Sequence, residues 1–334
     1  MGKILTLGES LARMTSPFGQ RLMNSTSLQL HYGGAEANVA MNLAMLDHDV
    51  EYATKLPLNN SLAENSMIQL YGKRVNCDKV IYGQGRLGSY YVEVGTGLRP
   101  SNVIYDRKYS AISMMERNEW DLDQLFSDVS VFHITGITVA LSDFWHEFGV
   151  ELVQAAKERG IKVSFDMNYR STMWTYDEAI PAYQAILPYV DYLSASQRDA
   201  IAFFGIDEVE GQDERFYLDA LAQEYPNLNY IFGTHRHALT PNSFEMIGYL
   251  YNCQTHTMYM SGEYDLETIV DRVGSGDSYT AGILDGILLE KEDANIPEFA
   301  MAAAALQHTI YGDINLFRRN EIERFMSNSE NVLR

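Results

Sequence analysis

Residues 271–282, DRVGSGDSYTAG, place glycines and a carboxylate directly before an apolar, helix-like stretch. Gly274, Ser275 and Gly276 leave room for the backbone to curl, so that successive N–H groups point at one anion. The helix predicted to follow adds its positive end, and Asp277 falls in its first turn. Such a cradle suits phosphoryl transfer to an alcohol, with Asp277 taking the hydroxyl proton. An ordinary glycine-rich strand-to-helix turn remains the alternative from this segment alone.

A second glycine turn could face a polyol. Gly33 and Gly34 precede a predicted helix and would let a sugar approach the backbone, and Asn38, one turn into that helix, could bond a hydroxyl. The alternative is a plain strand-to-helix turn with Asn38 in water, because glycine is the commonest residue of turns.

Tyr90, Tyr105 and Arg107 fall in segments that predict strands. Tyr105 and Arg107 are two residues apart, so we expect their side chains on one face of a strand. A guanidinium beside a phenol can bind a carboxylate and a neighbouring hydroxyl, since arginine binds planar carboxylates bidentately. A solvated arginine and packed tyrosines are the alternative.

The segment FDMNYR offers Asp166, Asn168 and Arg170 at the expected end of a strand. Their alternation predicts that they share one side of it. In a chain of formal charge -20, an arginine at the ligand edge of a sheet indicates an anion. A structural ion pair between Asp166 and Arg170 is the alternative.

Composition limits the functions open to the chain. Its 334 residues are 46% apolar, enough for a large buried core, and the charge of -20 argues against nucleic acids and anionic membranes as partners. Cys77 and Cys253 are too few for a disulfide framework or a zinc site. With no signal-peptide pattern at the start and no apolar run of membrane length, we expect a cytoplasmic location.

The elements expected to position these residues alternate between strands and helices. Apolar, β-rich segments predict strands at 3–9, 130–137, 162–168, 191–196 and 229–235, whereas helical periodicity marks 35–46, 143–159, 179–187, 213–225, 283–290 and 298–311. This alternation predicts an α/β fold, a mostly parallel sheet sandwiched by helices, with ligands at the carboxyl ends of the strands. Segments 18–33 and 83–115 lack helical periodicity and predict a small inserted β lid in the single domain 1–334.

Several segments in one order resemble the ribokinase (PfkB) family of sugar kinases, and within it the 2-keto-3-deoxygluconate kinases: LGESLARMTSP, HYGGAEANVAMNLAML, GRLGSYYVE, RPSNVIYDRKYSA, FDMNYR, DRVGSGDSYTAG and YGDINL. The resemblance spans nearly the whole chain. It implies a ribokinase-like fold and ATP-dependent phosphorylation of the terminal C6 hydroxyl of 2-keto-3-deoxygluconate, giving 2-keto-3-deoxy-6-phosphogluconate. ATP and Mg²⁺ are the implied cofactors, with a monovalent cation as a further candidate.

The resemblance also assigns roles to residues. It implies Asp277 as the base over the amides of 274–276. The implied substrate residues are Gly34, Asn38, Tyr90, Tyr105, Arg107, Arg170 and Asp313, and the implied nucleotide residues are Ser196, Gly233, Thr234, Gly274 and Gly276.

The chain departs from the family at two places. Ser196 and Asp199 stand where the family's magnesium-organising element has Asn and Glu, so no metal ligand is identified. Basic residues 235–237 follow Gly233 and Thr234, and they either meet phosphates or form a solvated loop. A fructokinase or other sugar kinase, and a catalytically silent sugar-acid sensor, are the alternative functions. The uncovered lid edges predict a homo-oligomer, a dimer through the lid or a larger assembly, and the gluconate or galactonate epimer stays open.

Overall fold

The computed structural model describes residues 2–240 and 243–327. Its large sheet runs in the order β14 (Thr257–Met260), β13 (Ser243–Asn252), β12 (Tyr230–Thr240), β11 (Tyr192–Ser194), β10 (Lys162–Asp166), β9 (Val129–Thr135), β1 (Lys3–Leu7), β4 (Val50–Ala53), with β15 (Tyr264–Leu266) also paired to β13. The six neighbouring strands β4, β1, β9, β10, β11 and β12 are parallel. Strand β13 is antiparallel to its three neighbours, β12, β14 and β15. The parallel strands therefore end at one edge, as the sequence predicts.

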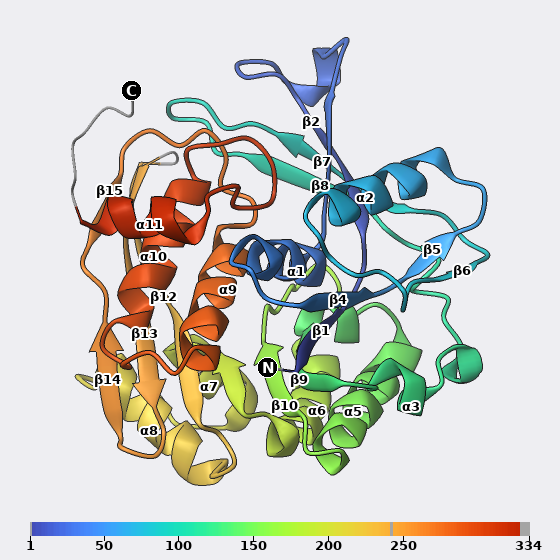
Figure 1. The fold of residues 1–334 in the computed structure, drawn as a ribbon. Helices are drawn as coiled ribbons and strands as arrows, with labels where there is room; N and C mark the ends of the chain where they lie inside the picture. The colour runs from blue at the N-terminus through green and yellow to red at the C-terminus, as the bar shows by residue number, and fades with distance from the viewer. Residues whose placement is uncertain (1, 241–242, 328–334) are drawn as a thin grey trace.

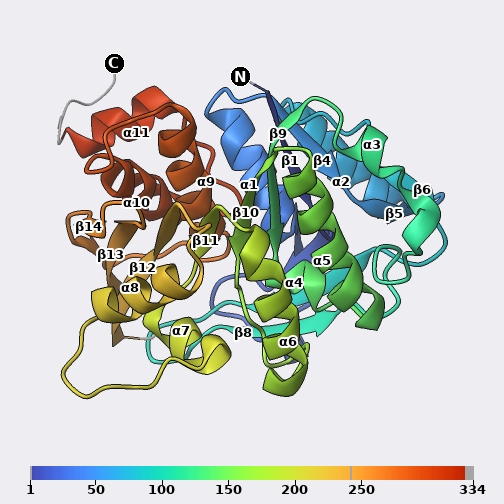
Figure 2. The same cartoon turned by 90° about the horizontal axis from the view of Figure 1, so that it is seen from below.

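Helices cover both faces of this sheet (Figure 1, Figure 2). One face carries α1 (Ala35–Met45), α9 (Ser275–Leu288) and α10 (Ile296–Gln307), with α11 (Arg319–Met326) packed on α10. The other carries α4 (Gly136–Val139), α5 (Asp143–Glu158), α6 (Tyr176–Ile186), α7 (Gln197–Phe204) and α8 (Glu214–Glu224). Side chains alternate along each strand, so Leu5 and Leu7 enter one core and Ile4 the other. This confirms the α/β fold class.

Local sequence explains where the helices begin and end. In α5, Trp145, Phe148 and Leu152 recur at helical spacing and are fully buried against the sheet. The chain leaves α5 through Gly160 at φ +74°, a left-handed conformation that glycine adopts without strain. Helix α6 starts with a capping box in which Thr175 and Glu178 satisfy each other's backbone N–H groups.

A separate four-stranded sheet, called here the small sheet, has the order β3 (Gln29–Gly33), β2 (Leu11–Thr15), β7 (Gly88–Glu93), β8 (Asn102–Asp106). Figure 1 shows β2, β7 and β8 side by side next to the main body. Three of its strands fall within 18–33 and 83–115, but β2 lies before the first of these segments. The predicted boundary missed β2 because its residues directly follow the first strand of the large sheet.

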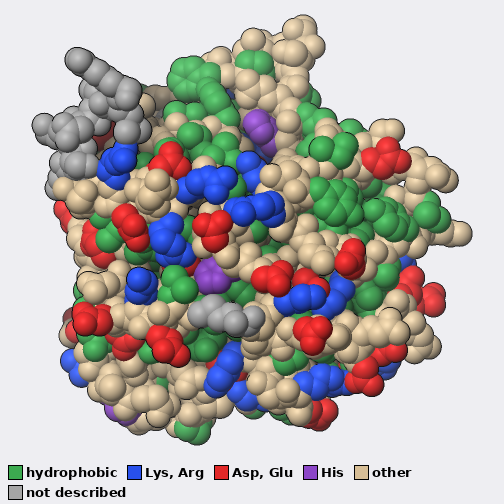
Figure 3. All heavy atoms as spheres, in the orientation of Figure 1, with side chains coloured by type: hydrophobic (Ala, Val, Ile, Leu, Met, Phe, Trp, Pro, Cys, Tyr) green, Lys and Arg blue, Asp and Glu red, His purple; other side chains and the backbone are tan. Residues whose placement is uncertain are grey.

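The remaining elements are short or peripheral. They are α2 (Ser61–Gly72), α3 (Leu122–Leu125), the pair β5 (Lys55–Pro57) and β6 (Ile81–Gly83), and the 3₁₀ turns Leu22–Asn24, Arg117–Glu119 and Leu187–Tyr189. Figure 3 shows apolar side chains gathered over the side of the molecule that carries α2, where Ile68 and Tyr71 are exposed. In the described part of the chain, no helix combines the length and the apolar character needed to cross a bilayer.

Candidate functional site

Two cavities meet at the start of α9, at the carboxyl edge of the parallel strands. The first has a volume of about 560 Å³ and the second about 840 Å³, and both are lined by Thr234, Arg236, Arg272 and Gly276. The first cavity gathers the sequence-predicted residues Gly34, Asn38, Tyr90, Tyr105, Arg107, Arg170, Gly233, Thr234, Gly274, Gly276, Asp277 and Asp313. The predicted residues Ser196 and Ser275 line the second cavity instead.

The start of α9 has the tight turn that its glycines indicate. Gly274 caps the helix at φ +83°, and a Cβ there would overlap the backbone carbonyl oxygen of Asp313. Gly276, by contrast, has open space where a Cβ would stand. Gly274 is therefore required by the fold, whereas Gly276 keeps the helix start open to a ligand in either cavity.

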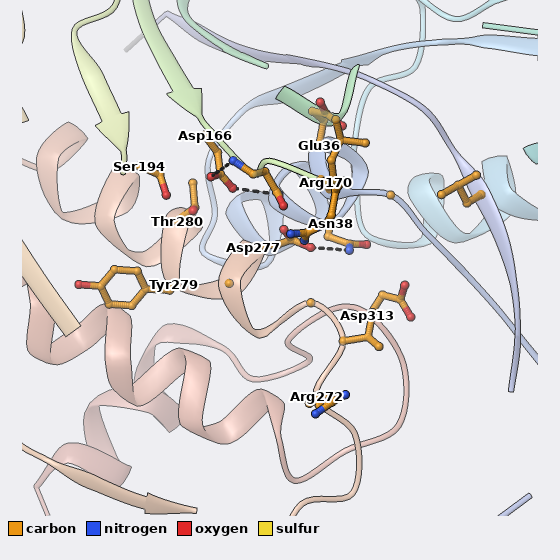
Figure 4. Close-up of a pocket in the computed structure, with 18 of the residues that line it drawn as sticks. Glu36, Asn38, Asp166, Arg170, Ser194, Arg272, Asp277, Tyr279, Thr280 and Asp313 are labelled. Carbon is orange, nitrogen blue, oxygen red and sulfur yellow. Dashed lines mark hydrogen bonds between the residues drawn. The ribbon is translucent and has the colours of Figure 1, made fainter. Parts of the chain in front are cut away.

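Asp277 sits in the first turn of α9 and accepts a 2.7 Å hydrogen bond from Asn38 Nδ2 on α1. Figure 4 shows this pair joined, with Asp166 and Asp313 around it. Burial raises the pKa of Asp277 to about 8, against the opposing effect of the Asn38 bond, and the charges of Asp166 and Asp313 raise it further. An acid with a pKa near working pH can exchange a proton with a substrate hydroxyl.

The turn before α1 is shaped by close backbone contact. Gly34 adopts φ +144°, and a Cβ there would overlap the carbonyl oxygen of Glu9. The next helical acid, Glu36, is buried and accepts hydrogen bonds from the hydroxyls of Thr135 at 2.8 Å and Thr138 at 2.7 Å. Burial raises the pKa of Glu36 to about 7. Glu36 lines the first cavity but carries no sequence signal apart from its neighbours in this turn.

Asp313 is buried and held by two donors. Arg13 Nη1 donates to Oδ1 at 2.6 Å, and the Tyr90 hydroxyl donates to Oδ2. Both Tyr90 and Asp313 were predicted to contact substrate, and the structure joins them to each other at the wall of the first cavity. Arg13 also donates to Asp271 Oδ2 at 2.6 Å, so it bridges two carboxylates.

Arg107 is likewise held by a carboxylate. Its Nε donates to Glu9 Oε2 at 2.7 Å, and Nη2 forms an ion pair with the same oxygen. The guanidinium lies 5.9 Å from the ring centre of Tyr105, which stacks on Tyr90. Strand β8 ends at Asp106, one residue before Arg107, yet the expected neighbourhood of Tyr105 and Arg107 is present.

At the end of β10 the prediction of a shared strand face is wrong. The strand stops at Asp166, and Asn168 turns back at φ +39° to donate to both oxygens of Asp166. Burial raises the pKa of Asp166 to about 6, although the charge of Arg170 opposes this. Within the described chain Arg170 forms no ion pair with Asp166, and it lines the first cavity as an exposed cation.

The second cavity is rich in arginines that have no carboxylate partner among the described residues, although Arg236 lies over the ring of Phe244. Arg198, Arg236 and Arg272 line it and form no ion pair with any described residue. Burial and the neighbouring charge of Arg236 lower the pKa of Arg272. Many arginines elsewhere are paired with Asp or Glu, among them Arg13, Arg21, Arg74, Arg86, Arg99, Arg107, Arg159 and Arg319. Unpaired like charges at a helix start indicate a polyanionic ligand.

The elements around the second cavity correct one expectation and show how Ser196 and Asp199 are placed. Strand β12 extends to Thr240, so residues 235–237 lie on a strand paired with β13, not in a solvated loop. Ser196 caps α7 and donates to Asp199 at 2.7 Å in a capping box. The two residues that replace the family's Asn and Glu therefore bond to each other.

Sequence reasoning missed Glu9, Arg13, Asp271 and Arg272 as members of the site. Glu9 follows the first strand, so the rule that ligands gather at carboxyl ends of strands would have found it. Arg13 gives no local signal, because its partners Asp271 and Asp313 lie 258 and 300 residues away in the chain.

Comparison with known proteins agrees with this geometry. The profile described as pfkB family carbohydrate kinase matches residues 1–227. The chain is 29% identical to the 2-dehydro-3-deoxygalactonokinase of Haloferax volcanii over 324 residues, 97% of this chain and 96% of that one. A pfkB carbohydrate kinase structure from Listeria grayi is 41% identical, and the Thermotoga maritima 2-dehydro-3-deoxygluconokinase is 34% identical. Both have a TM-score of 0.93, over 98% of this chain and 100% of theirs. The chain belongs to the pfkB family of carbohydrate kinases and is an enzyme of that class.

Proposed function

We propose that the protein is a 2-keto-3-deoxy sugar-acid kinase that phosphorylates the terminal C6 hydroxyl of 2-keto-3-deoxygluconate with ATP. The observation that carries the proposal is the meeting of the two cavities at Gly276, with Asp277 as the next residue. One cavity offers hydrogen-bonding groups suited to a sugar acid, and the other offers unpaired cations suited to a triphosphate. Relatives whose names give 2-dehydro-3-deoxy sugar acids, the systematic form of the same 2-keto-3-deoxy compounds, support the substrate class.

In this proposal the substrate lies along the first cavity with its carboxylate toward Arg107 and Arg170. Its terminal hydroxyl faces Asp277, which accepts the proton as the hydroxyl oxygen forms a bond to the γ-phosphorus and the bond to ADP breaks. Asn38 holds the Asp277 carboxylate in place during this step. The amides at the start of α9 stabilise the charge on the transferring group.

ATP lies in the second cavity in this proposal, with its phosphates near Arg236 and Arg272 and against Gly233 and Thr234. An adjoining cavity is lined by Asp166, Asp199 and Thr234, whose side chains offer oxygen atoms as metal ligands. This set fits Mg²⁺, because Mg²⁺ binds few protein carboxylates and keeps several of its waters. When bound, Mg²⁺ neutralises phosphate charge. A monovalent cation stays a prediction from the resemblance.

One observation favours a second candidate, a kinase of neutral sugars such as fructose. Glu9 already balances the charge of Arg107, so this arginine does not by itself demand an anionic substrate. Arg170 then supplies the net positive charge for a carboxylate. The two candidates differ in whether a sugar without a carboxylate is phosphorylated.

A coupled ADP-release screen over sugar acids and neutral sugars tests the proposal. We expect turnover with 2-keto-3-deoxygluconate or its galactonate epimer and much slower turnover with fructose and ribose. A preference for fructose over every sugar acid would replace the proposal by the neutral-sugar kinase. The ratio of kcat/KM for the two epimers in the same screen decides which of them is the better substrate.

We also propose that the protein forms a dimer through the small sheet. Apolar side chains are exposed on or beside its two edge strands, β3 and β8: Leu28, Leu30, Val103 and Ile104. An uncovered edge invites pairing with a second copy. A strictly monomeric, fully active species in sedimentation at tens of micromolar would exclude the dimer. A cytoplasmic location is part of the proposal, since Cys77 and Cys253 are both buried free thiols.

A further inference from the structure

We propose that Arg13 is a positioning residue that fixes Asp313 and the start of α9 relative to each other, so that the sugar acid and the transferring phosphate meet in line. The inference rests on the proposed function, because it takes Asp313 as a wall of the substrate cavity. Arg13 itself is absent from the lining of the first cavity, so it acts through the residues that it holds.

The Arg13 side chain is only 1% exposed and its donors reach three segments. Nε donates to Thr15 Oγ1 at 2.9 Å within β2. Nη1 and Nη2 donate at 2.6 Å to Asp313, which follows α10, and to Asp271, which precedes α9. A planar guanidinium with its donors fixed in a fork holds two carboxylates at a set separation and angle.

The small sheet contributes a second bond to the same carboxylate. Tyr90 on β7 is the register partner of Arg13 on β2, and its hydroxyl donates to the other oxygen of Asp313. Both oxygens of Asp313 are thus occupied by donors from two neighbouring strands. These bonds attach the small sheet to the loop between α10 and α11, which contains Asp313.

The same loop touches the anion cradle. The carbonyl of Asp313 lies where a Cβ of Gly274 would stand, so the two backbones are in direct contact. Asp271 accepts a bond from the Gly312 N–H at 3.2 Å and from the Val273 N–H at 3.1 Å. A displacement of either carboxylate therefore moves the turn that carries Gly274 and orients Asp277.

Charge explains why this residue is an arginine. Asp271 is 8% exposed and Asp313 is 2% exposed, and two buried carboxylates this close repel each other unless a cation lies between them. Although burial opposes it, the charges of Asp313 and Asp271 raise the pKa of Arg13, so the guanidinium stays charged. A lysine has a single point of charge and cannot bond both carboxylates in the fork geometry.

The test compares Arg13→Ala and Arg13→Lys with the parent enzyme. Misplacement by about 1 Å can cost on the order of 10²-fold in rate, so we expect kcat of Arg13→Ala to fall by that order. The KM for ATP should stay within about threefold, since the nucleotide arginines are untouched. The kcat of Arg13→Lys should lie between that of the parent and that of Arg13→Ala. Added methylguanidinium should restore the kcat of Arg13→Ala as its concentration rises.

Arg319→Ala is the matched control, because Arg319 also holds a buried carboxylate, Asp285, at 2.7 Å but lines neither the first nor the second cavity. We expect it to lower Tm without lowering kcat. A kcat of Arg13→Ala within threefold of the parent, or a loss of Tm like that of Arg319→Ala with no rescue by methylguanidinium, would overturn the inference. The ratios are measured on whichever sugar the parent phosphorylates, so a parent that rejects sugar acids disproves the proposed substrate and leaves this test valid.

Discussion

The arginines on the two sides of α9 differ in their partners. On the substrate side, Arg13 and Arg107 are paired with Asp271, Asp313 and Glu9, and Arg170 is an exposed cation without an ion pair to any described residue. On the nucleotide side, Arg198, Arg236 and Arg272 have no carboxylate partner within the described chain. If the proposed function holds, the difference means that paired arginines position the sugar acid, with Arg170 as its free cation, and that several arginines without ion pairs attract the nucleotide.

The physical reason lies in the ligands that each side is proposed to receive. A sugar acid carries one negative charge, so a cavity of unpaired arginines would hold far more charge than the ligand balances. ATP carries several negative charges and can itself compensate the arginines that the protein leaves unpaired. In a chain of net charge -20, leaving cations unpaired at one place also concentrates its attraction for anions there.

Asp277 lies between the two sides, and we expect its replacement to have the largest effect on kcat. Replacing Asp277 by Asn keeps its size and the contact with Asn38 but removes the base, so we expect kcat to fall by on the order of 10²–10⁴-fold with both KM values nearly unchanged. Steady-state kinetics measures this, with Asp265→Asn, an exposed acid of β15, as control. Turnover within about threefold of the parent would defeat the assignment of Asp277.

Binding of the keto-acid in the first cavity should depend strongly on Arg107. Arg107→Ala removes a charge-assisted donor, worth roughly 1.5–3 kcal/mol, so the KM for the keto-acid should rise about 10- to 100-fold while that for ATP changes by a few-fold at most. It also leaves Glu9 as a buried anion without its cation. We therefore expect the double variant with Glu9→Gln to recover part of the loss.

Arg86→Ala is the control for Arg107, because Arg86 pairs with Asp106 beside the same strand but lines neither of the two cavities. Equal losses for ATP and keto-acid in Arg107→Ala would show that the two sides are not separate. That result would also remove the support for a carboxylate contact at this residue.

The pH dependence of kcat/KM gives a second test of Asp277. The pKa of Asp277 is raised to about 8, and a general base acts only in its deprotonated form. We expect kcat/KM for the sugar acid to rise about tenfold per unit of pH below 8 and to level off above it. A profile that is flat between pH 6 and 8 would contradict a free-enzyme base with this pKa.

The nucleotide side should respond more weakly, because each arginine shares the phosphates with others. Arg272→Met should raise the KM for ATP by roughly three- to tenfold, which corresponds to about 0.7–1.4 kcal/mol, the net worth of a typical hydrogen bond. The KM for the keto-acid should change less than that for ATP, because Arg272 lies where the two cavities meet. Arg318→Met, at an arginine that begins α11 and lines neither cavity, is the control. A change in the keto-acid KM alone would reverse the assignment of the two cavities.

Local patterns predicted five strands of the large sheet and the place of Asp277 at the start of α9, but not the strands β4, β13, β14 and β15. They predicted the helices α1, α5, α6, α8, α9 and α10, but not α2, α3, α4, α7 and α11. They did so because periodicity and glycine turns are encoded within a few residues. They failed where the structure depends on distant partners, as in the bridge from Arg13 to Asp271 and Asp313. They also failed at β10, where the turn at Asn168 ends the strand earlier than its residue pattern suggests.

The outermost strand of the small sheet has a consequence for enzyme engineering. Strand β8 is exposed along its whole length, whereas β2 and β7 are fastened to the rest of the enzyme through Arg13 and Tyr90. If the proposed function holds, substitutions in β8 can alter which acceptor the enzyme takes without breaking the bonds that Arg13 and Tyr90 make to Asp313. Libraries aimed at new acceptors should be built at Val103 and Tyr105, where the strand borders the cavity, and should keep β2 and β7 constant.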